Sequence, residues 1–189
     1  RFAFFPSVSA GWRIANEDFF STLRNVFNDF KLRASYGNLG NQAVSSYYPY
    51  IATYGIGQVN YLFGGNSLMT VYAPGLVSPT LTWEKVAQYN VGIDFSILDN
   101  RLSGSVDIYE RRTTDMLTKA KSLPSVLGTN EPQTNAADLK TKGFETTLSW
   151  KQTVKNGLSY GLHLVLSDYI STITKYDNPK GILSDYYVG

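Results

Sequence analysis

The sequence has no cysteine, a single histidine and no long hydrophobic run. The lack of cysteine excludes disulfides and thiolate metal sites, and His163 alone cannot form a histidine cluster. No apolar run approaches the ~18 residues of a membrane-spanning helix. If such a chain meets a membrane, it must do so with closed β-structure, because lipid offers no partner to backbone hydrogen-bonding groups.

Charged side chains are also scarce, at 17% of 189 residues, against roughly 25% in soluble globular domains. The 17 Lys and Arg and the 15 Asp and Glu leave a net charge of +2. The basic residues do not form a stripe that would neutralise a phosphate backbone, so nucleic acid is not an expected partner. Aromatic residues are abundant instead, at 14%, and 14 of them are Tyr.

Six stretches alternate apolar and polar residues with a period of two, which predicts β-strands with one apolar face. In the first stretch, Val8, Ala10 and Trp12 lie on one side, and Ser9 and Gly11 on the other. The apolar side can meet either the core of a soluble protein or lipid. The six predicted strands cover residues 4–14, 30–37, 83–97, 101–115, 142–151 and 158–167.

Compact and long connections alternate between the predicted strands. Residues 98–101 and 154–158 predict tight hairpins, the second through its Asn-Gly pair. Residues 16–29 predict a short helix. The connections at the opposite end are long, about 45 and 25 residues, and this division is typical of outer-membrane barrels. The predicted helix is capped by Asn16, and its shared face carries Phe19, Leu23, Val26 and Phe27.

Aromatic residues on the apolar faces gather at two levels. Between these levels the faces are mostly aliphatic, over about the 9 to 11 residues that a tilted strand needs to cross a bilayer. Two aromatic girdles around an aliphatic band favour a barrel wall in lipid, although Tyr89 lies within the band. The girdle residues are Trp12, Phe30, Phe95, Trp150 and Tyr160 near the compact connections, and Phe4, Tyr36, Trp83 and Phe144 near the long ones.

Five motifs, in this order, resemble the barrel of SusC/RagA-type TonB-linked outer-membrane proteins. They are "FFPSVSAGWRI" at 4–14, "NEDFF" at 16–20, "LRASYGNLGNQ" at 32–42, "LTWEKVAQYNVGIDFSILDNRLSGSVDIYERRTTDML" at 81–117 and "KGFETTLSW" at 142–150. The resemblance implies an all-β fold, an antiparallel transmembrane β-barrel of about 22 strands with short periplasmic turns and long extracellular loops. We expect residues 1–189 to supply about six of these strands, as an internal part of a single barrel domain. The plug domain is expected to lie outside this chain.

The resemblance also implies a location and a function. The location is the cell outer membrane of a Gram-negative, Bacteroidetes-like organism, and the function is TonB-dependent import of oligosaccharides or peptides. Expected partners are a SusD-like surface lipoprotein that closes the outer mouth, TonB acting through the plug, the cargo and outer-membrane lipid. No catalytic residue, cofactor or metal ion is expected. Two alternatives stay open: a soluble all-β carbohydrate-binding module with its faces buried in a sandwich, and a passive porin.

The Tyr-rich segment 45–63 is the candidate for contact with cargo. Flat, rigid aromatic rings cover sugar or peptide surfaces at low entropic cost and keep a hydroxyl for hydrogen bonding. Packing within the loop, or against the lid lipoprotein, is the alternative for the same side chains. The candidate contact residues are Tyr47, Tyr48, Tyr50, Tyr54 and Tyr61.

The two faces of the predicted strands have different expected roles. Polar and charged residues of one face, Arg33, Asp94 and Asp107 among them, are expected to line the lumen, pair across strands and hold the plug. His163 is expected to be a structural residue of that face, and no G-x-S-x-G motif indicates a serine hydrolase. The predicted lipid-facing residues are Val8, Ala10, Trp12, Ile14, Leu32, Val91, Ile93, Phe95, Leu148, Trp150, Leu162 and Leu164.

Overall fold

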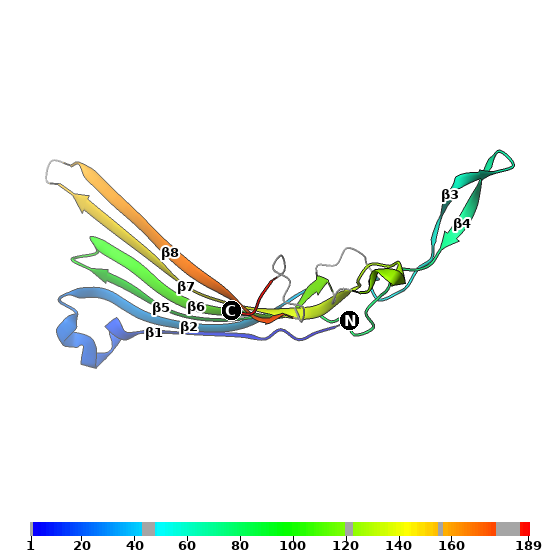
Figure 1. Cartoon of the computed structure of the whole chain (residues 1–189). Helices are drawn as coiled ribbons and strands as arrows, with labels where there is room; N and C mark the ends of the chain where they lie inside the picture. The colour runs from blue at the N-terminus through cyan, green and yellow to red at the C-terminus, as the bar shows by residue number, and fades with distance from the viewer. Residues whose placement is uncertain (1, 43–47, 120–122, 155–156, 177–185) are drawn as a thin grey trace.

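The main body of the protein is one antiparallel sheet of six strands (Figure 1). The computed structural model describes residues 2–42, 48–119, 123–154, 157–176 and 186–189. Along the sheet the strand order is β1-β2-β5-β6-β7-β8, so each strand pairs with its successor in this series. The six predicted strands are confirmed, and the differences lie at their ends. Their bounds are β1 (Ser7–Arg13), β2 (Phe27–Asn41), β5 (Glu84–Ile97), β6 (Leu102–Lys119), β7 (Gln133–Thr153) and β8 (Ser159–Tyr176).

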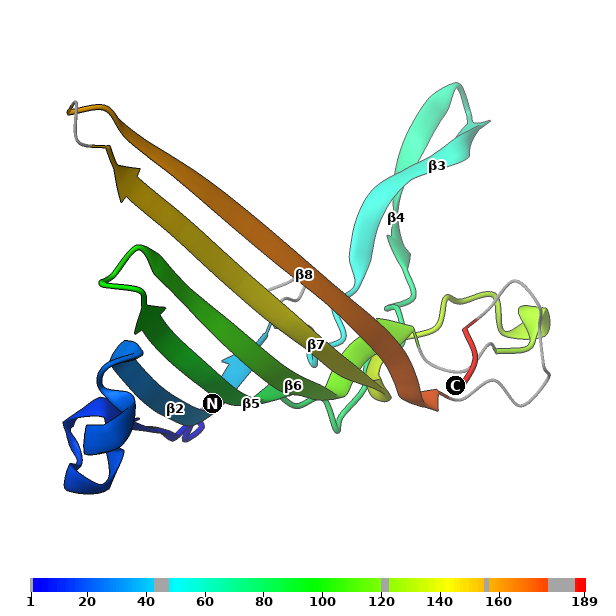
Figure 2. The same cartoon turned by 90° about the vertical axis from the view of Figure 1, so that its left-hand side faces the viewer.

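The compact connections all lie at one end of the sheet, which we call the turn end; the opposite end is the loop end (Figures 1 and 2). Between β5 and β6, Leu98, Asp99 and Asn100 adopt positive φ angles of 57°, 55° and 63°. Asp and Asn tolerate this conformation because their side chains replace lost backbone contacts. Between β7 and β8, Gly157 has a φ of 87°, while residues 155 and 156 of the predicted hairpin lie outside the described residues.

The connection between β1 and β2 is not the predicted α-helix. It consists of two 3₁₀ segments, η1 (Ile14–Asn16) and η2 (Asp18–Leu23), and Asn16 caps neither of them. A 3₁₀-helix has three residues per turn, so its packed face differs from that of an α-helix. The side chain of η2 that packs against the sheet is Phe20, which is 7% exposed. Phe19 and Leu23, which the prediction placed on the packed face, are exposed at 67% and 48%.

Within the first long connection, the structure contains a hairpin that the sequence reading missed. It is formed by β3 (Gly55–Phe63) and β4 (Asn66–Tyr72). Gly64 and Gly65 join the two strands at φ angles of 58° and 82°, the backbone that a two-residue primed turn requires. Both views show the hairpin projecting beyond the loop end, away from the six-stranded sheet (Figures 1 and 2).

The sheet is a single layer, and its apolar side chains are largely uncovered. Val91, Ile108 and Leu162 are 59%, 65% and 70% exposed. Among the described side chains, none is less than 2% exposed. The buried cluster is small and lies at the turn end, where Ile14, Ala15 and Phe20 pack on Phe27, Phe30 and Leu32 of β2. A soluble sandwich would cover the apolar face with a second sheet, and the described part of the chain holds none.

Over the part of the chain that the structure describes, no helix has the length and hydrophobicity to cross a membrane.

Candidate functional site

Cross-strand pairing brings the predicted lipid-facing residues onto one side of the sheet, which we call the outward face. Directly paired residues of an antiparallel sheet share a face. One row runs Ala10–Ala34–Val91–Ile108 and the next runs Trp12–Leu32–Ile93–Val106. On the later strands, Leu148 pairs with Leu164 and Trp150 with Leu162. Phe95 and Leu148 flank Gly104 of β6, and Val8 pairs with Tyr36, so all of these residues belong to the same face.

Ile14 is an exception among the predicted lipid-facing residues. Its side chain is only 9% exposed and belongs to the small buried cluster with Phe20. The prediction that Ile14 faces lipid is therefore wrong, because the 3₁₀ segments fold back over this residue. Trp12, one position earlier on the same face, stays 49% exposed, and its indole Nε1 donates a hydrogen bond of 2.8 Å to Glu17 Oε1.

The opposite, inward face carries an ion network that spans three strands. The Arg33 guanidinium of β2 donates two hydrogen bonds of 2.8 Å to the Asp94 carboxylate of β5. Its Nη2 also donates to Asp107 Oδ2 of β6 at 2.9 Å. The expected pairing of charges across strands is confirmed for these three residues. The guanidinium fork satisfies two carboxylates that would otherwise repel each other on neighbouring strands.

Gly92 makes the space in which this network lies. It pairs with Arg33 on one side and with Asp107 on the other. A Cβ atom at this position would overlap the Asp107 carboxylate and lie 2.9 Å from Arg33 Nη2. Glycine is therefore the residue that allows Arg33 to reach across β5 to the third strand.

Two further polar contacts of the inward face lie nearer the turn end. Ser149 and His163 Nδ1 are joined by a hydrogen bond of 2.7 Å. Arg13 forms a two-pronged ion pair with Asp29, at 2.8 and 2.9 Å, which the sequence reading did not identify. The hydrogen bond from Arg13 lowers the pKa of Asp29, a residue beyond the Phe30 girdle position. Within the described residues, no group of three or more His, Asp or Glu side chains is arranged to hold a metal ion.

At the loop end, one side chain ties the long loop to the sheet. The Asn135 amide of β7 accepts a hydrogen bond from Thr82 N at 2.9 Å and donates to Thr82 O at 3.1 Å. It also donates to Asp115 O at 2.6 Å. These bonds hold Thr82, which lies just before β5, against β6 and β7. No sequence motif around Asn135 predicted these hydrogen bonds.

The Tyr-rich segment does not form one continuous surface. Tyr48 lines a hollow of about 380 Å³ with Ile51, Ser78 and Glu131, and its ring lies 6.3 Å from that of Tyr50. Tyr54 precedes the hairpin, and Tyr61 lies on β3; they are 70% and 63% exposed. The structure thus brings Tyr48 and Tyr50 together and separates the other two. Tyr47 lies outside the described residues.

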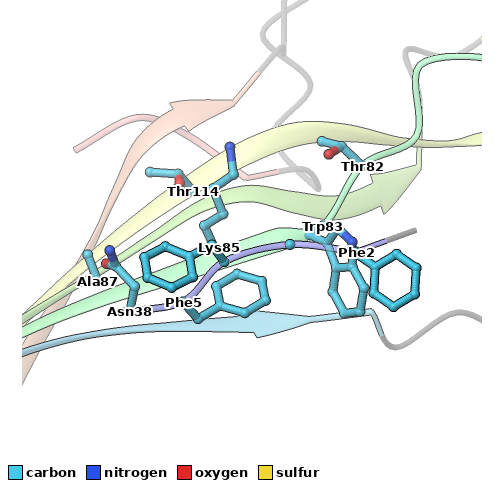
Figure 3. A pocket seen from close by; sticks show the side chains of 10 residues that line it. Phe2, Phe5, Asn38, Thr82, Trp83, Lys85, Ala87 and Thr114 are labelled. Carbon is cyan, nitrogen blue, oxygen red and sulfur yellow. The ribbon is translucent and has the colours of Figure 1, made fainter. Parts of the chain in front are cut away.

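A second hollow lies at the loop end of the outward face (Figure 3). Its aromatic side is formed by Phe5 and Trp83, whose rings meet edge to face at 5.9 Å. Its polar side comes from Asn38, Lys85 and Thr114. Trp83 Nε1 is buried and has no hydrogen-bond partner among the described residues. A buried indole N–H of this kind normally finds an acceptor.

The chain matches a family model over nearly its whole length. The model is described as the TonB dependent receptor-like β-barrel, and it matches residues 1–187. The chain belongs to this family. It therefore forms a segment of a transmembrane β-barrel, in agreement with the single-layer amphipathic sheet. Membership favours the barrel over the soluble module.

Relatives of this TonB-dependent receptor segment include the receptor SusC of Bacteroides thetaiotaomicron. The two are 32% identical over 191 residues, which cover 100% of this chain and 18% of SusC. The TonB-dependent receptor P3 of Formosa agariphila is 32% identical over 149 residues, 79% of this chain and 14% of P3. The chain thus spans less than a fifth of the length of these curated relatives.

Among solved structures, the receptor segment is similar to the RagAB peptide importer. In its closed-closed state the TM-score is 0.78 at 28% identity, over 92% of this chain and 18% of that chain. In the open-open state the TM-score is 0.76 over the same shares. The fold of this segment is therefore also found in part of a larger solved protein.

Proposed function

We propose that this chain forms part of the wall and outer loops of an outer-membrane, TonB-dependent importer of oligosaccharides or peptides. One observation carries the proposal: a single-layer sheet exposes aliphatic rows on one face and pairs charges on the other. Such a sheet is stable only where lipid covers the first face and a filled or watery lumen adjoins the second. The family membership and the likeness to SusC support this assignment.

The proposed orientation follows the connections. The turn end lies at the periplasm and the loop end outside the cell, as in other outer-membrane barrels. The outward face meets lipid, with Trp12, Phe95 and Trp150 near the periplasmic interface. The inward face, including the Arg33 network, meets the lumen and the plug that other parts of the protein supply.

Transport in this proposal divides between regions. The chain's own contribution is a rigid, polar wall, because the Arg33 network holds three strands together without placing an unpaired charge in the path. Gating belongs to the plug, which TonB pulls from the periplasm. We assign no catalysis, cofactor or metal ion to this wall.

The loop end supplies recognition. Ile56, Leu62 and Phe63 of the projecting hairpin are 73%, 70% and 71% exposed, an apolar surface of the kind that marks protein interaction sites. We assign the hairpin to the SusD-like lid lipoprotein. The hollow beside Tyr48 is assigned to cargo, and the likeness to a peptide importer favours a peptide there.

Uptake by whole cells tests the import function. Cells that express the intact protein with its lid partner should accumulate a labelled peptide mixture or labelled oligosaccharides, and a protonophore should abolish the accumulation. Accumulation that survives the protonophore would identify a passive pore instead. The comparison of peptides with oligosaccharides assigns the cargo class.

Two matched variants test the cargo site within the intact protein. Tyr48→Ala removes a ring that lines the hollow, and cargo affinity is expected to fall about tenfold, ~1.4 kcal/mol. Tyr54→Ala removes a ring outside the hollow and should leave cargo affinity within twofold. Equal losses in both variants would contradict the assignment of the hollow.

A further inference from the structure

A cluster of charges lies at the loop end of the outward face, and we call it the cationic cluster. It consists of Glu110 and Arg112 of β6 with Lys140 and Lys142 of β7. All three cations contact the one carboxylate: Arg112 Nε lies 2.5 Å from Glu110 Oε1, and the Lys140 and Lys142 Nζ atoms lie 3.4 and 3.7 Å from Oε2. The hydrogen bond from Arg112 lowers the pKa of Glu110. Three cations against one carboxylate leave the cluster with excess positive charge.

The register places this cluster directly beyond the aliphatic band. Ile108 pairs with Phe144, which belongs to the predicted upper girdle, and the next outward pair is Glu110 with Lys142. One step on the same face spans two residues, roughly 7 Å along a strand. The cluster therefore lies where a bilayer passes from acyl chains to headgroups. Lys142 and Arg112 are 63% and 55% exposed there.

Neighbouring side chains shape the site. The Arg112 guanidinium lies 5.8 Å from the centre of the Tyr89 ring, which limits its freedom. Arg112 pairs with Ala87, and Lys85 with Thr114, so the cluster adjoins the hollow of Figure 3 with its unpartnered Trp83 Nε1.

Among the described residues, the other nearby carboxylates form no ion pair with the three cations of the cluster. Lys85 pairs with Asp115 at 3.5 Å. Two further carboxylates lie nearby: Asp138 of β7, whose Oδ1 accepts a hydrogen bond from Asp115 N at 3.0 Å, and Asp168, which pairs across from Phe144 on β8. Asp168 Oδ1 accepts a hydrogen bond of 2.8 Å from Tyr169 N, and among the described residues the ion pair of Lys142 is with Glu110.

We propose that the cationic cluster binds the phosphate of a lipid headgroup in the outer leaflet, with the acyl chains lying along the apolar rows below. This inference rests on the proposed function, because it needs the outward face to meet lipid. Arg and Lys bind phosphate oxygens through short, charge-assisted hydrogen bonds, and basic residues at a membrane surface attract anionic lipid. The continuous apolar rows beneath the cluster favour a lipid over a protein partner.

The test uses the intact barrel in phosphatidylcholine nanodiscs that contain monophosphoryl lipid A. Native mass spectrometry should show the phosphorylated lipid retained after detergent washing, and the same lipid after phosphatase treatment retained at least tenfold less. The triple variant R112Q/K140Q/K142Q should lose retention at least tenfold. A charge-matched control, R101Q/R111Q/K151Q, removes three cations elsewhere and should retain the lipid within twofold.

Four outcomes would overturn the proposal: equal retention of the dephosphorylated lipid, unchanged retention in the triple variant, equal losses in the control, and full displacement by inorganic phosphate at the lipid's concentration. The last result would identify a free-phosphate site. If the triple variant keeps its lipid and loses the lid lipoprotein, the cluster is a protein-docking surface instead. Heat-modifiable migration and import are scored in parallel. Failure of the proposed function is thus seen as a barrel that does not insert or import, separately from a barrel that inserts without the lipid.

Discussion

The turn end and the loop end of the same six strands differ in almost every physical respect. At the turn end, connections are compact, Phe20 of η2 packs on Phe27 and Phe30 of β2, and aromatic side chains dominate. At the loop end, the strands continue past the aliphatic band, and the outward face turns charged at Glu110. The difference indicates that the surrounding medium, rather than strand pairing, decides where alternation of apolar and polar residues is needed.

The largest expected effect comes from placing a charge in the aliphatic band between the two ends. Val91→Arg should destabilise the intact barrel by about 2 to 4 kcal/mol, because Val91 lies on the central outward row and a cation there must enter lipid. Urea unfolding of the protein in lipid vesicles measures this loss. The same reasoning applies to Ala10→Arg in the same row.

The control for Val91→Arg is its neighbour in sequence. Asn90 lies on the inward face, paired with Ser35 and Tyr109, and Asn90→Arg should cost much less. On β1 the equivalent control for Ala10→Arg is Ser9→Arg. Equal costs on the two faces would contradict the assignment of lipid to the outward face.

The strand positions predicted from the sequence were accurate inside the aliphatic band and inaccurate beyond it, at the loop end. Residues 142–151 predicted a strand that begins at Gln133, and residues 158–167 predicted one that continues to Tyr176. Beyond the band both faces meet water or other loops, so nothing enforces alternation although pairing continues. The cationic cluster was missed for the same reason, since only the register of β6 and β7 brings Arg112 to Lys140.

Two local errors have different causes. The β3–β4 hairpin does carry a signal, the Gly64-Gly65 pair, which is one of the recognised two-residue turn sequences. The segment between β1 and β2 carried a misleading signal, because spacing at three and four residues predicts a helical face without distinguishing α from 3₁₀ geometry. The hollow beside Tyr48 joins residues that are far apart in the sequence, such as Ser78 and Glu131, and no local pattern encodes such contacts.

The next effect in size concerns the inward face. Arg33→Met leaves the Asp94 and Asp107 carboxylates without their shared cation, and we expect a loss of ~1 to 2 kcal/mol, reduced by partial solvent exposure. Chemical unfolding in detergent micelles measures it. Adding D94N and D107N to R33M should recover most of the loss. If D94N and D107N recover none of the lost stability, Arg33 does not act by pairing with these two carboxylates.

A smaller change in stability, with a separate change in binding, is expected in the projecting hairpin. Leu62→Ser with Phe63→Ser should leave unfolding within ~0.5 kcal/mol, as for most surface substitutions. Affinity for the lid lipoprotein should fall about tenfold, ~1.4 kcal/mol. Biolayer interferometry with the purified lid measures it. Thr70→Ser on β4 of the hairpin is the control, and unchanged lid affinity in the double variant would show that Leu62 and Phe63 do not contact the lid.

The smallest effect is expected at the turn end, in the dependence of stability on pH. Because the hydrogen bond from Arg13 lowers the pKa of Asp29, the folded state binds this proton less readily than the unfolded chain. The ion pair thus stabilises the barrel above the ordinary range of an aspartate, about pH 4, and this contribution is lost as the pH falls further. In Asp29→Asn the unfolding midpoint should therefore fall less between pH 6 and pH 3 than it does in the parent protein. Asp99→Asn, in the adjacent β5–β6 turn, should keep the fall of the parent; the same fall in both variants would show that the turn end does not depend on this pair.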